Sequence, residues 1–348
     1  MNRITLAHGA GGSMMQDLIK KYILRYLGGS GTEVPLEALD DSSVVNNIVL
    51  TTDSHTVKPL FFPGGDIGRL AVSGTVNDIA MMGAEPMALT SGIVFEEGFK
   101  IEIFERIIKS MQSTCQEAGV FITTGDIKVV EKGALDELFI NTSGIGRRNE
   151  ALENNLAEIK KYRNINFRWL LDSNLKAGDK IIISGTIGDH GVAIISSRED
   201  YGFKSQIISD VAPLNKIVMK LLMVGGILKM KDPTRGGLSN TLNEWSERSK
   251  VGISIYEENI PIKEGVKSAC EMLGIDPLEI ANEGKIVIAV LPGKVDEILD
   301  ELKQSKEGKE AQIIGEVTNK FNQVVLETKV GGKRIITPPL GDPIPRIC

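Results

Sequence analysis

The aspartates of the N-terminal third are the residues most able to do chemistry together. The candidates are Asp40, Asp41, Asp53, Asp66, Asp78 and Asp126. Several of them stand at the end of an apolar run or beside a glycine, where a carboxylate can project into a shared cleft. Oxygen ligands without neighbouring His or Cys suit Mg²⁺, which is held by one or two carboxylates together with substrate phosphates and water. The pattern therefore indicates phosphate chemistry, although any single aspartate could equally cap a turn or a helix.

Glycine-rich turns supply a possible second half of a phosphate site. The turn 9–12 contains Gly11 and Gly12 and precedes a helical pattern, and two similar turns lie at 185–191 and 232–237. Backbone N–H groups and the positive end of a helix can bind phosphate there. None of the turns matches the P-loop or the complete dinucleotide fingerprint, which disfavours a P-loop kinase and a Rossmann dehydrogenase. Each turn is a weak signal, since glycine also serves plain turns.

The last residue, Cys348, is a thiol behind a proline-rich segment. Four of the 13 prolines lie between residues 338 and 345, a spacing that forbids a helix and favours an extended chain. Extended at about 3.1 Å per residue, the segment from Pro338 would reach about 30 Å. It could enter a site on the protein or on a partner, or it could be a frayed terminus. Cys115 and Cys270 lie in amphipathic stretches, and three cysteines without CxxC spacing indicate neither zinc nor a disulfide framework.

Other catalytic groupings do not assemble. The three histidines are scattered, and the sequence has no HExxH and no GxSxG, which argues against zinc hydrolysis and a serine triad. Lys128 and Glu283 stand in loop-like settings beside strands. Either could act as a general base or contact phosphate if its surroundings shift its pKa, and either could be plain solvated surface.

Alternating helix and strand patterns place these residues in an α/β (α+β) protein of two domains. In the first domain, residues 1–150, we expect helices at 13–27, 68–82 and 101–118, and strands at 44–50, 92–95, 121–123 and 138–145. Residues 149–174 read as a connecting helix and loop. The second domain, 151–330, shows strand patterns at 180–184, 252–256, 285–291 and 311–318, and helical ones at 192–198, 211–223, 238–249 and 295–301. Residues 331–348 form a flexible tail.

Composition excludes several classes. The net charge is −6, from 40 Lys+Arg against 46 Asp+Glu, and no basic stripe is present, so we expect no nucleic acid partner. No stretch is apolar for long enough to span a bilayer, and the first residues lack the apolar core of a secretory signal. We expect no membrane contact and a cytoplasmic location.

Several motifs taken together resemble the HypE family of hydrogenase maturation factors. The match runs through the whole chain in order: HGAGG at 8–12, a run from Asp53 that includes FPGGDIG at 62–68, GTVNDIAMMGA at 74–84, TGDIKVV at 124–130, DPTRGGL at 232–238, ANEGK at 281–285 and PRIC at 345–348. FPGGDIG together with the terminal PRIC is highly specific. The resemblance implies a two-domain AIR synthase-like fold, in which the N-terminal domain binds ATP and forms a β-barrel across a homodimer.

The resemblance also implies a reaction. HypE-like proteins receive a carbamoyl group on the C-terminal cysteine from the carbamoyltransferase HypF. Mg-ATP then drives dehydration of this S-carboxamide to an S-cyanate, and the cyanide passes to iron on the HypC–HypD scaffold for the [NiFe]-hydrogenase centre. The alternative within the superfamily is a small-molecule ATP-dependent kinase or amide-activating enzyme, for which Cys348 would be incidental. A non-catalytic scaffold with a docking tail would hydrolyse no ATP.

The resemblance finally implies roles for individual residues. Cys348 would be the acceptor thiol, and Lys128 and Glu283 the candidates for proton transfer. The metal carboxylates would be Asp41, Asp53, Asp78 and Asp126, with the choice between Asp40 and Asp41 left open. The remaining cofactor-binding positions would be Gly11, Gly12, Asp66, Asn77 and Asp232.

Overall fold

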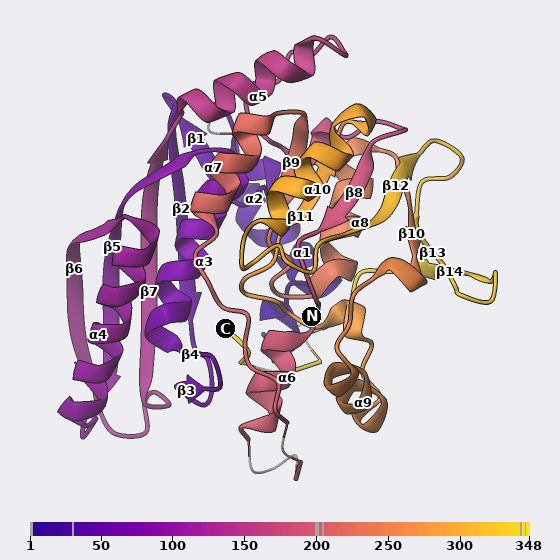
Figure 1. Cartoon of the computed structure of the whole chain (residues 1–348). Helices are drawn as coiled ribbons and strands as arrows, with labels where there is room; N and C mark the ends of the chain where they lie inside the picture. Colours follow the sequence, from indigo (N-terminus) through magenta and orange to yellow (C-terminus); the bar gives the residue numbers. More distant parts are fainter. Residues whose placement is uncertain (1–2, 30, 199–201, 204, 342, 345) are drawn as a thin grey trace.

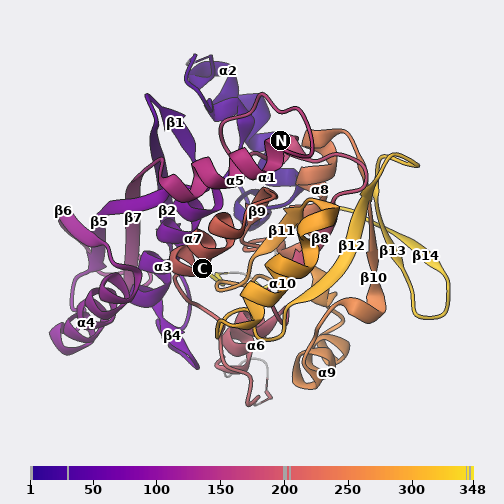
Figure 2. The same cartoon turned by 45° about the horizontal axis from the view of Figure 1, so that its top comes forward.

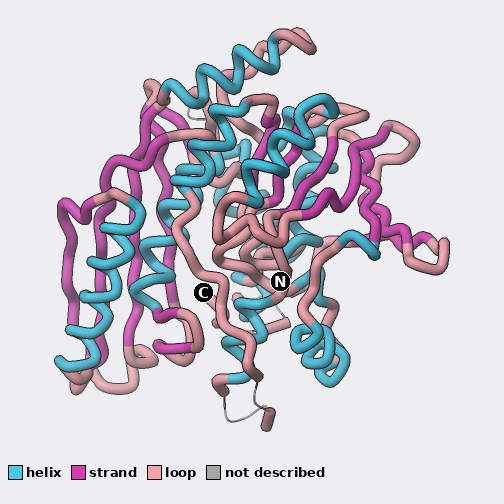
Figure 3. Tube along the Cα trace, in the orientation of Figure 1, coloured by secondary structure: helices cyan, strands magenta, loops and turns pink. Residues whose placement is uncertain are grey.

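The computed structural model describes residues 3–29, 31–198, 202–203, 205–341, 343–344 and 346–348. Its described strands form two large sheets and one two-stranded hairpin, with helices between and around the large sheets (Figures 1 and 3). Among the described residues, no helix is both long and apolar enough to cross a membrane.

The N-terminal half is built on a five-stranded sheet in the order β1-β2-β7-β5-β6. Its strands are β1 (Ser43–Val45), β2 (Ile48–His55), β5 (Glu85–Glu96), β6 (Phe121–Val130) and β7 (Leu138–Arg147). β5 and β6 are parallel, and the other pairs are antiparallel. A short hairpin of β3 (Phe61–Phe62) and β4 (Gly65–Asp66) leads into α3 (Ile67–Met81), which packs with α4 (Ile101–Ala118) on the sheet. Strand β6 is an edge strand, exposed along nearly its whole length.

The first helical segment is continuous but irregular. The sequence predicts one helix over 13–27, and the structure divides it into α1 (Ser13–Leu18), a π-helical turn (Ile19–Ile23) and α2 (Leu24–Leu27). The segment keeps Tyr22, Tyr26 and Leu27 exposed, so it lacks the fully buried face that would favour regular packing.

The C-terminal half contains a seven-stranded sheet in the order β14-β13-β10-β12-β8-β11-β9. The strands are β8 (Lys180–Ile183), β9 (Ile227–Lys231), β10 (Gly252–Tyr256), β11 (Val287–Val290), β12 (Gln312–Thr318), β13 (Val324–Glu327) and β14 (Lys333–Ile336). The helices are α5 (Glu150–Lys160), α6 (Asp189–Ser196), α7 (Asn215–Val224), α8 (Gly237–Ser249), α9 (Glu264–Leu273) and α10 (Val295–Lys303). Strands β8, β9 and β11 are almost entirely buried, as expected for strands covered on both faces.

Both hydrophobic cores cross the domain boundary predicted at residue 150. One contains Val44 and Ile79 of the first domain together with Trp245 and Ile288 of the second. The other joins α3 and α4 to α6 and to the last residues of the chain. The two halves therefore share buried surface, which fixes the cleft between them.

The C-terminal segment ends between the two halves (Figures 1 and 2). The sequence analysis begins the tail at residue 331, but the structure begins it after Ile336, because Lys333–Ile336 pair with β13 as an antiparallel strand. Ile344 and Ile347 are buried in the core that joins α3 to α6. Asp342 and Pro345 of the predicted tail lie outside the described residues.

Candidate active site

Five acidic residues from both halves of the chain meet at the domain junction. Asp41 precedes β1, Asp53 lies on β2, Asp78 lies on α3, Asp232 follows β9, and Glu283 lies in the loop before β11. Burial raises the pKa of Asp78 well above its ordinary value, and the charges of Asp232, Asp53 and Asp41 raise it further. Burial first, then Asp41, raises the pKa of Asp232 to about 7. The junction thus holds more negative charge than it compensates, which favours a bound cation.

Glu283 is the most deeply buried of these acids. Burial, then Asp232 and Asp53, raise its pKa well above the ordinary value for glutamate. Its Oε1 is buried without a hydrogen-bond partner among the described residues. A buried carboxyl group with a raised pKa binds a proton more readily than an ordinary glutamate, which is the direction that a general base requires.

A glycine in α3 makes room for the carboxylate of Asp53. A Cβ at Gly74 would lie 2.9 Å from Asp53 Oδ2. The same Oδ2 lies 3.5 Å from Nε2 of the buried His55. The helix therefore approaches β2 closely enough to leave only the cleft side of Asp53 open.

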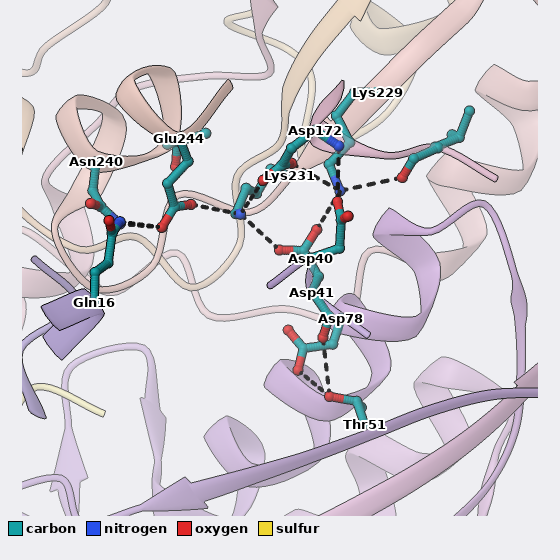
Figure 4. Close-up of polar contacts among 12 residues, drawn as sticks. Gln16, Asp40, Asp41, Thr51, Asp78, Asp172, Lys229, Lys231, Asn240 and Glu244 are labelled. Carbon is teal, nitrogen blue, oxygen red and sulfur yellow. Dashed lines mark hydrogen bonds and ion pairs between the residues drawn. The ribbon is translucent and has the colours of Figure 1, made fainter. Parts of the chain in front are cut away.

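Two buried lysines hold Asp41 in place (Figure 4). We call this group the lysine-carboxylate network; it consists of Lys229 and Lys231 on β9 with Asp40, Asp41, Asp172 and Glu244. Lys229 Nζ lies 2.8 Å from Asp41 and 3.3 Å from Asp40, and Lys231 Nζ lies 2.7 Å from Glu244. The network anchors the segment before β1 of one half to a strand of the other half.

The network also separates the two neighbouring aspartates. Asp40 Oδ1 accepts hydrogen bonds from the main chain N–H of Asp172 and from Lys229, so it faces the second half of the chain. Asp41 is the one whose charge raises the pKa of both Asp78 and Asp232. Asp41 is therefore the better candidate for a metal ligand.

The acidic junction offers donors that suit Mg²⁺. All of its carboxylates are hard oxygen donors, and the charges of Asp41 and Asp53 help to raise the pKa of Asp78 and Asp232, a repulsion that a divalent cation would relieve. Among the described residues, no group of three Asp, Glu, His or Cys side chains is already arranged to hold an ion. Phosphate oxygens and water would have to complete the coordination, which is how Mg²⁺ is usually bound beside a nucleotide.

The C-terminal cysteine lies beside this junction. Cys348 and Arg235 both line a cavity of about 270 Å³, together with Ser54, Thr56 and the first turn of the chain. The pKa of Arg235 is raised, chiefly by the charge of Cys348. Burial opposes this shift, and the charges of Asp53, Glu283 and Asp78 add to it. The guanidinium thus stands between the tail and the acidic residues. All three cysteines of the chain are outside disulfides.

The tail reaches this cavity by pairing with the chain after β2. Thr56 N donates to Cys348 O at 3.1 Å, and Lys58 N donates to Arg346 O at 3.2 Å. In both bonds the segment after β2 donates and a carbonyl oxygen of the tail accepts. Because they use main chain atoms, they set the register of the last residues at the cavity.

Arg235 is a residue that the sequence analysis missed. It lies in the turn 232–237, which was singled out for its glycines alone. Those glycines have a structural reason: a Cβ at Gly237 would lie 2.5 Å from the carbonyl oxygen of Ile280. The arginine inside a glycine-rich turn beside an aspartate was the available signal.

Two of the predicted cofactor-binding positions have other contacts in the structure. Asp66 is the N-cap of α3 and accepts from the N–H groups of Gly68 and Arg69. The amide of the buried Asn77 bonds to Ala212 O and Leu214 N, and so ties α3 to the second half. These side chains are already engaged as structural ties.

The predicted phosphate cradle at Gly11 and Gly12 is filled by the chain itself. A Cβ at Gly12 would lie 2.0 Å from Pro339 O, and Ser13 N donates to the same oxygen at 3.2 Å. A Cβ at Gly11 would lie 2.7 Å from Arg235 Cβ. The turn thus packs against the tail and against the arginine loop.

Asp126 and Lys128 lie away from the acidic junction within one chain. They stand in strand β6, not in a loop, because the strand continues to Val130 where the sequence predicts an end at 123. Two strands separate β2 from β6, and the register places Asp126 about 14 Å across the sheet from Asp53 at about 4.8 Å per strand. Asp126 and Lys128 form an exposed ion pair at 3.4 Å. One chain therefore does not bring them to the other predicted metal ligands.

Comparisons with known proteins identify the family. Residues 39–148 match the N-terminal domain of AIR synthase related proteins, and residues 176–326 match the C-terminal domain. The carbamoyl dehydratase HypE of Rhizobium leguminosarum bv. viciae is 45% identical over 99% of this chain and 95% of its own length.

Solved structures agree. HypE in a HypE–HypF complex is 48% identical with a TM-score of 0.83, covering 92% of this chain and 99% of that chain. HypE in complex with ATP is 39% identical with a TM-score of 0.79, covering 99% of this chain and 100% of that chain. The chain therefore belongs to the HypE family of AIR synthase-related proteins.

Proposed function

We propose that this protein is a carbamoyl dehydratase of hydrogenase maturation. It converts a carbamoyl group on Cys348 into an S-cyanate at the cost of ATP, and so supplies the cyanide ligand for the iron of [NiFe]-hydrogenase. The observation that carries the proposal is the C-terminal thiol seated in one cavity with Arg235, next to the acidic junction. Full-length relatives named carbamoyl dehydratase HypE and a HypE structure with ATP support it.

The chemistry requires a leaving group and a base. An S-carboxamide loses the elements of water when it becomes an S-cyanate: the C–O bond breaks, the C≡N bond forms, and nitrogen gives up two protons. ATP, the second substrate, supplies the phosphoryl group that lets the amide oxygen depart as phosphate, with ADP as the other product. Glu283 is positioned by burial and charge to take the protons. Arg235 balances the negative charge that develops on the transferred oxygen.

The proposed reaction also uses Mg²⁺, bound by carboxylates of the acidic junction. Asp41, Asp53 and Asp78 are the carboxylates we assign to it, with Asp232 beside them. A bound Mg²⁺ would neutralise phosphate charge during the transfer. Asp66 and Asn77 would support the site by holding α3, through the contacts described above.

A homodimer would bring Asp126 and Lys128 of one subunit to the acidic junction of the other subunit. Strand β6 is an open edge with the large apolar side chains of Phe121, Ile127 and Val129 exposed, which is typical of an edge that pairs with another chain. We propose that two subunits join their N-terminal sheets along this edge into a β-barrel. Asp126 and Lys128 of one subunit then complete the ATP site of the other.

Mixed dimers test this arrangement. Asp126→Ala and Asp78→Asn are each expected to be inactive alone. If Asp126 acts across the interface, a heterodimer of the two variants keeps one intact site of two. An equal mixture with random pairing then recovers about a quarter of the wild-type activity. An inactive mixture, with heterodimers verified by native mass spectrometry, would place Asp126 in its own subunit's site, and activity of Asp126→Ala alone would remove it from the site.

The partners follow from the reaction. HypF, the partner in a solved HypE complex, is the proposed donor of the carbamoyl group. The HypC–HypD complex is the proposed acceptor of the cyanide, and the cytoplasm is the proposed location. The small-molecule kinase is less favoured, because it gives no reason for the terminal thiol to lie in the cavity with Arg235.

Intact mass spectrometry tests the function directly. The protein is loaded with carbamoyl phosphate and HypF, separated from both, and then given Mg-ATP. We expect about +43 Da on the C-terminal peptide after loading and about +25 Da after Mg-ATP, the masses of a carbamoyl and a cyano group replacing hydrogen. Cys348→Ala should fold normally and stay unmodified. Modification elsewhere, or turnover of a free substrate by that variant, would refute the assignment.

A further inference from the structure

A buried histidine holds the last peptide of the chain. His190 lies in the first turn of α6 and is fully buried. Its Nε2 is 2.8 Å from the carbonyl oxygen of Ile347, and its Nδ1 is 2.8 Å from Oγ of Ser209. Because a carbonyl oxygen only accepts, Nε2 must carry the proton and Nδ1 must accept from the serine hydroxyl. Burial lowers the pKa of His190, which keeps the ring in this neutral form.

The segment that fixes His190 also fixes the loop of Glu283. Asp210 follows Ser209, and its two carboxylate oxygens accept from the N–H groups of Glu283 and Gly284, each at 3.2 Å. Ala212 N donates to Glu283 O at 3.2 Å, and a Cβ at Gly284 would lie 1.8 Å from Asp210 O. Residues 209–212 therefore touch the tail contact on one side and the proposed base on the other.

His190 differs from the other groups that bind the tail. Thr56 and Lys58 use main chain N–H groups, which no substitution removes without a proline, and the Thr56 hydroxyl adds a longer bond to Cys348 O at 3.4 Å. Arg198 reaches Arg346 O from a side chain that is partly open to water. The bond from His190 is fully enclosed and lies one residue before the thiol. Loss of this enclosed group leaves Ile347 O without its histidine donor and the Ser209 hydroxyl without its histidine acceptor, so it costs more than loss of an exposed bond.

We propose that His190 is a positioning residue that keeps the C-terminal tail seated at the active site, and that it thereby sets the balance between the two half-reactions. The inference rests on the proposed function, because loading by HypF needs the thiol outside and dehydration needs it inside. A seated tail favours dehydration, and a released tail favours loading. His190 acts on the reaction through the position of Cys348 and of the Glu283 loop, without touching the reacting atoms.

The test compares His190→Leu with His190→Gln. Leucine fills the space without a donor, whereas the amide N–H₂ of glutamine can replace Nε2–H. We expect leucine to shift the equilibrium between the seated and the released tail about tenfold toward release. This factor corresponds to about 1.4 kcal/mol for one enclosed hydrogen bond. Removal of Cys348 by carboxypeptidase Y and carbamoylation by HypF should both become faster by up to that factor. Dehydration of the loaded protein should slow, and glutamine should reverse all three changes.

Controls separate positioning from a general structural defect. Ser209→Ala removes the donor to Nδ1 and should move the same three rates in the same directions, by less. Ser197→Ala is the matched control, because Ser197 lies at the opposite, C-terminal end of the same helix and its hydroxyl donates to Ala193 O. It should change none of them. Thermal unfolding shows whether each variant is folded.

The outcomes are distinct. Faster carboxypeptidase release with slower dehydration supports the proposal. If carboxypeptidase Y removes Cys348 from folded His190→Leu at the wild-type rate, the proposal is overturned. It is also overturned if carbamoyl loading and dehydration both become slower in that variant. Carboxypeptidase release involves no carbamoyl chemistry. If the wild-type protein accepts no carbamoyl group, the proposed function fails while the release rate still decides the role of His190.

Discussion

Removal of one buried lysine should destabilise the protein strongly. Lys229→Met keeps the length of the side chain and deletes the ammonium group that lies 2.8 Å from Asp41 and 3.3 Å from each of Asp40 and Asp172. Lys229 is fully buried. The variant therefore leaves buried carboxylates facing Lys231 alone.

The magnitude follows from that burial. Breaking a buried ion pair by removing one partner costs about 3–5 kcal/mol, because the remaining charge loses its compensation without regaining water. With a dependence on urea of about 3 kcal/mol per molar, the unfolding midpoint should fall by about 1–1.7 M. Trp169 and Trp245 are both buried in the core shared by the two halves, so their fluorescence reports the transition.

Two further variants make the result decisive. Lys180→Met, on strand β8 of the same sheet, deletes a lysine whose partner Glu316 is about one-third exposed, and it should cost at most about 1 kcal/mol. Lys229→Met with Asp40→Asn removes one stranded charge and should recover part of the loss, as a double-mutant cycle would measure. A loss for Lys229→Met no larger than that for Lys180→Met would refute the reasoning.

Three other predictions use different contacts. Arg235→Gln should slow dehydration about 10²–10³-fold while loading with a carbamoyl group continues, and Arg235→Lys should recover part of the rate; equal mass-spectrometric time courses would remove Arg235 from the site. Asn77→Ala should cost about 1–3 kcal/mol in thermal unfolding, since it deletes two buried hydrogen bonds between the halves. Burial raises the pKa of the Cys270 thiol to about 11. At pH 8 little thiolate is present there, so iodoacetamide should label Cys348 well before Cys270 in folded protein, and the reverse order would contradict that environment.

The acidic part of the site was predictable from local signals. Asp53, Asp78 and Asp232 each follow or interrupt an apolar run, and the ends of such elements converge in α/β proteins. The structure brings them together at the junction of the halves. The two-domain fold was predictable for the same reason, because helix and strand periods alternate clearly along the chain.

The cationic part was not predictable in this way. Lys229 and Lys231 flank Met230 in a strand, and alternating lysines normally indicate an exposed face. Here their aspartate partners come from more than 50 residues away in the sequence, so only the tertiary structure explains their burial. Lys128 was misplaced for a related reason: strand β6 continues beyond the run of apolar residues, since pairing with β5 extends it to Val130.

The position of the C-terminal tail could not be predicted from the sequence either. Four prolines predict an extended chain, but the described residues 340, 341, 343, 344 and 346 lie in bends, and Arg346 has a φ of 54°. The position of the segment depends on bonds from residues as distant as Thr56 and His190. A local sequence pattern favours a conformation, whereas long-range contacts determine where the segment lies in the structure.

The tethered thiol has a consequence for inhibition. Only the short segment after Ile336 links Cys348 to the folded sheet. A group on a short tether is present at its site at an effective concentration in the millimolar range. A free peptide that copies the tail would have to exceed that concentration to displace it, whereas a small molecule that enters the Arg235 cavity while the tail is being loaded meets no such competitor.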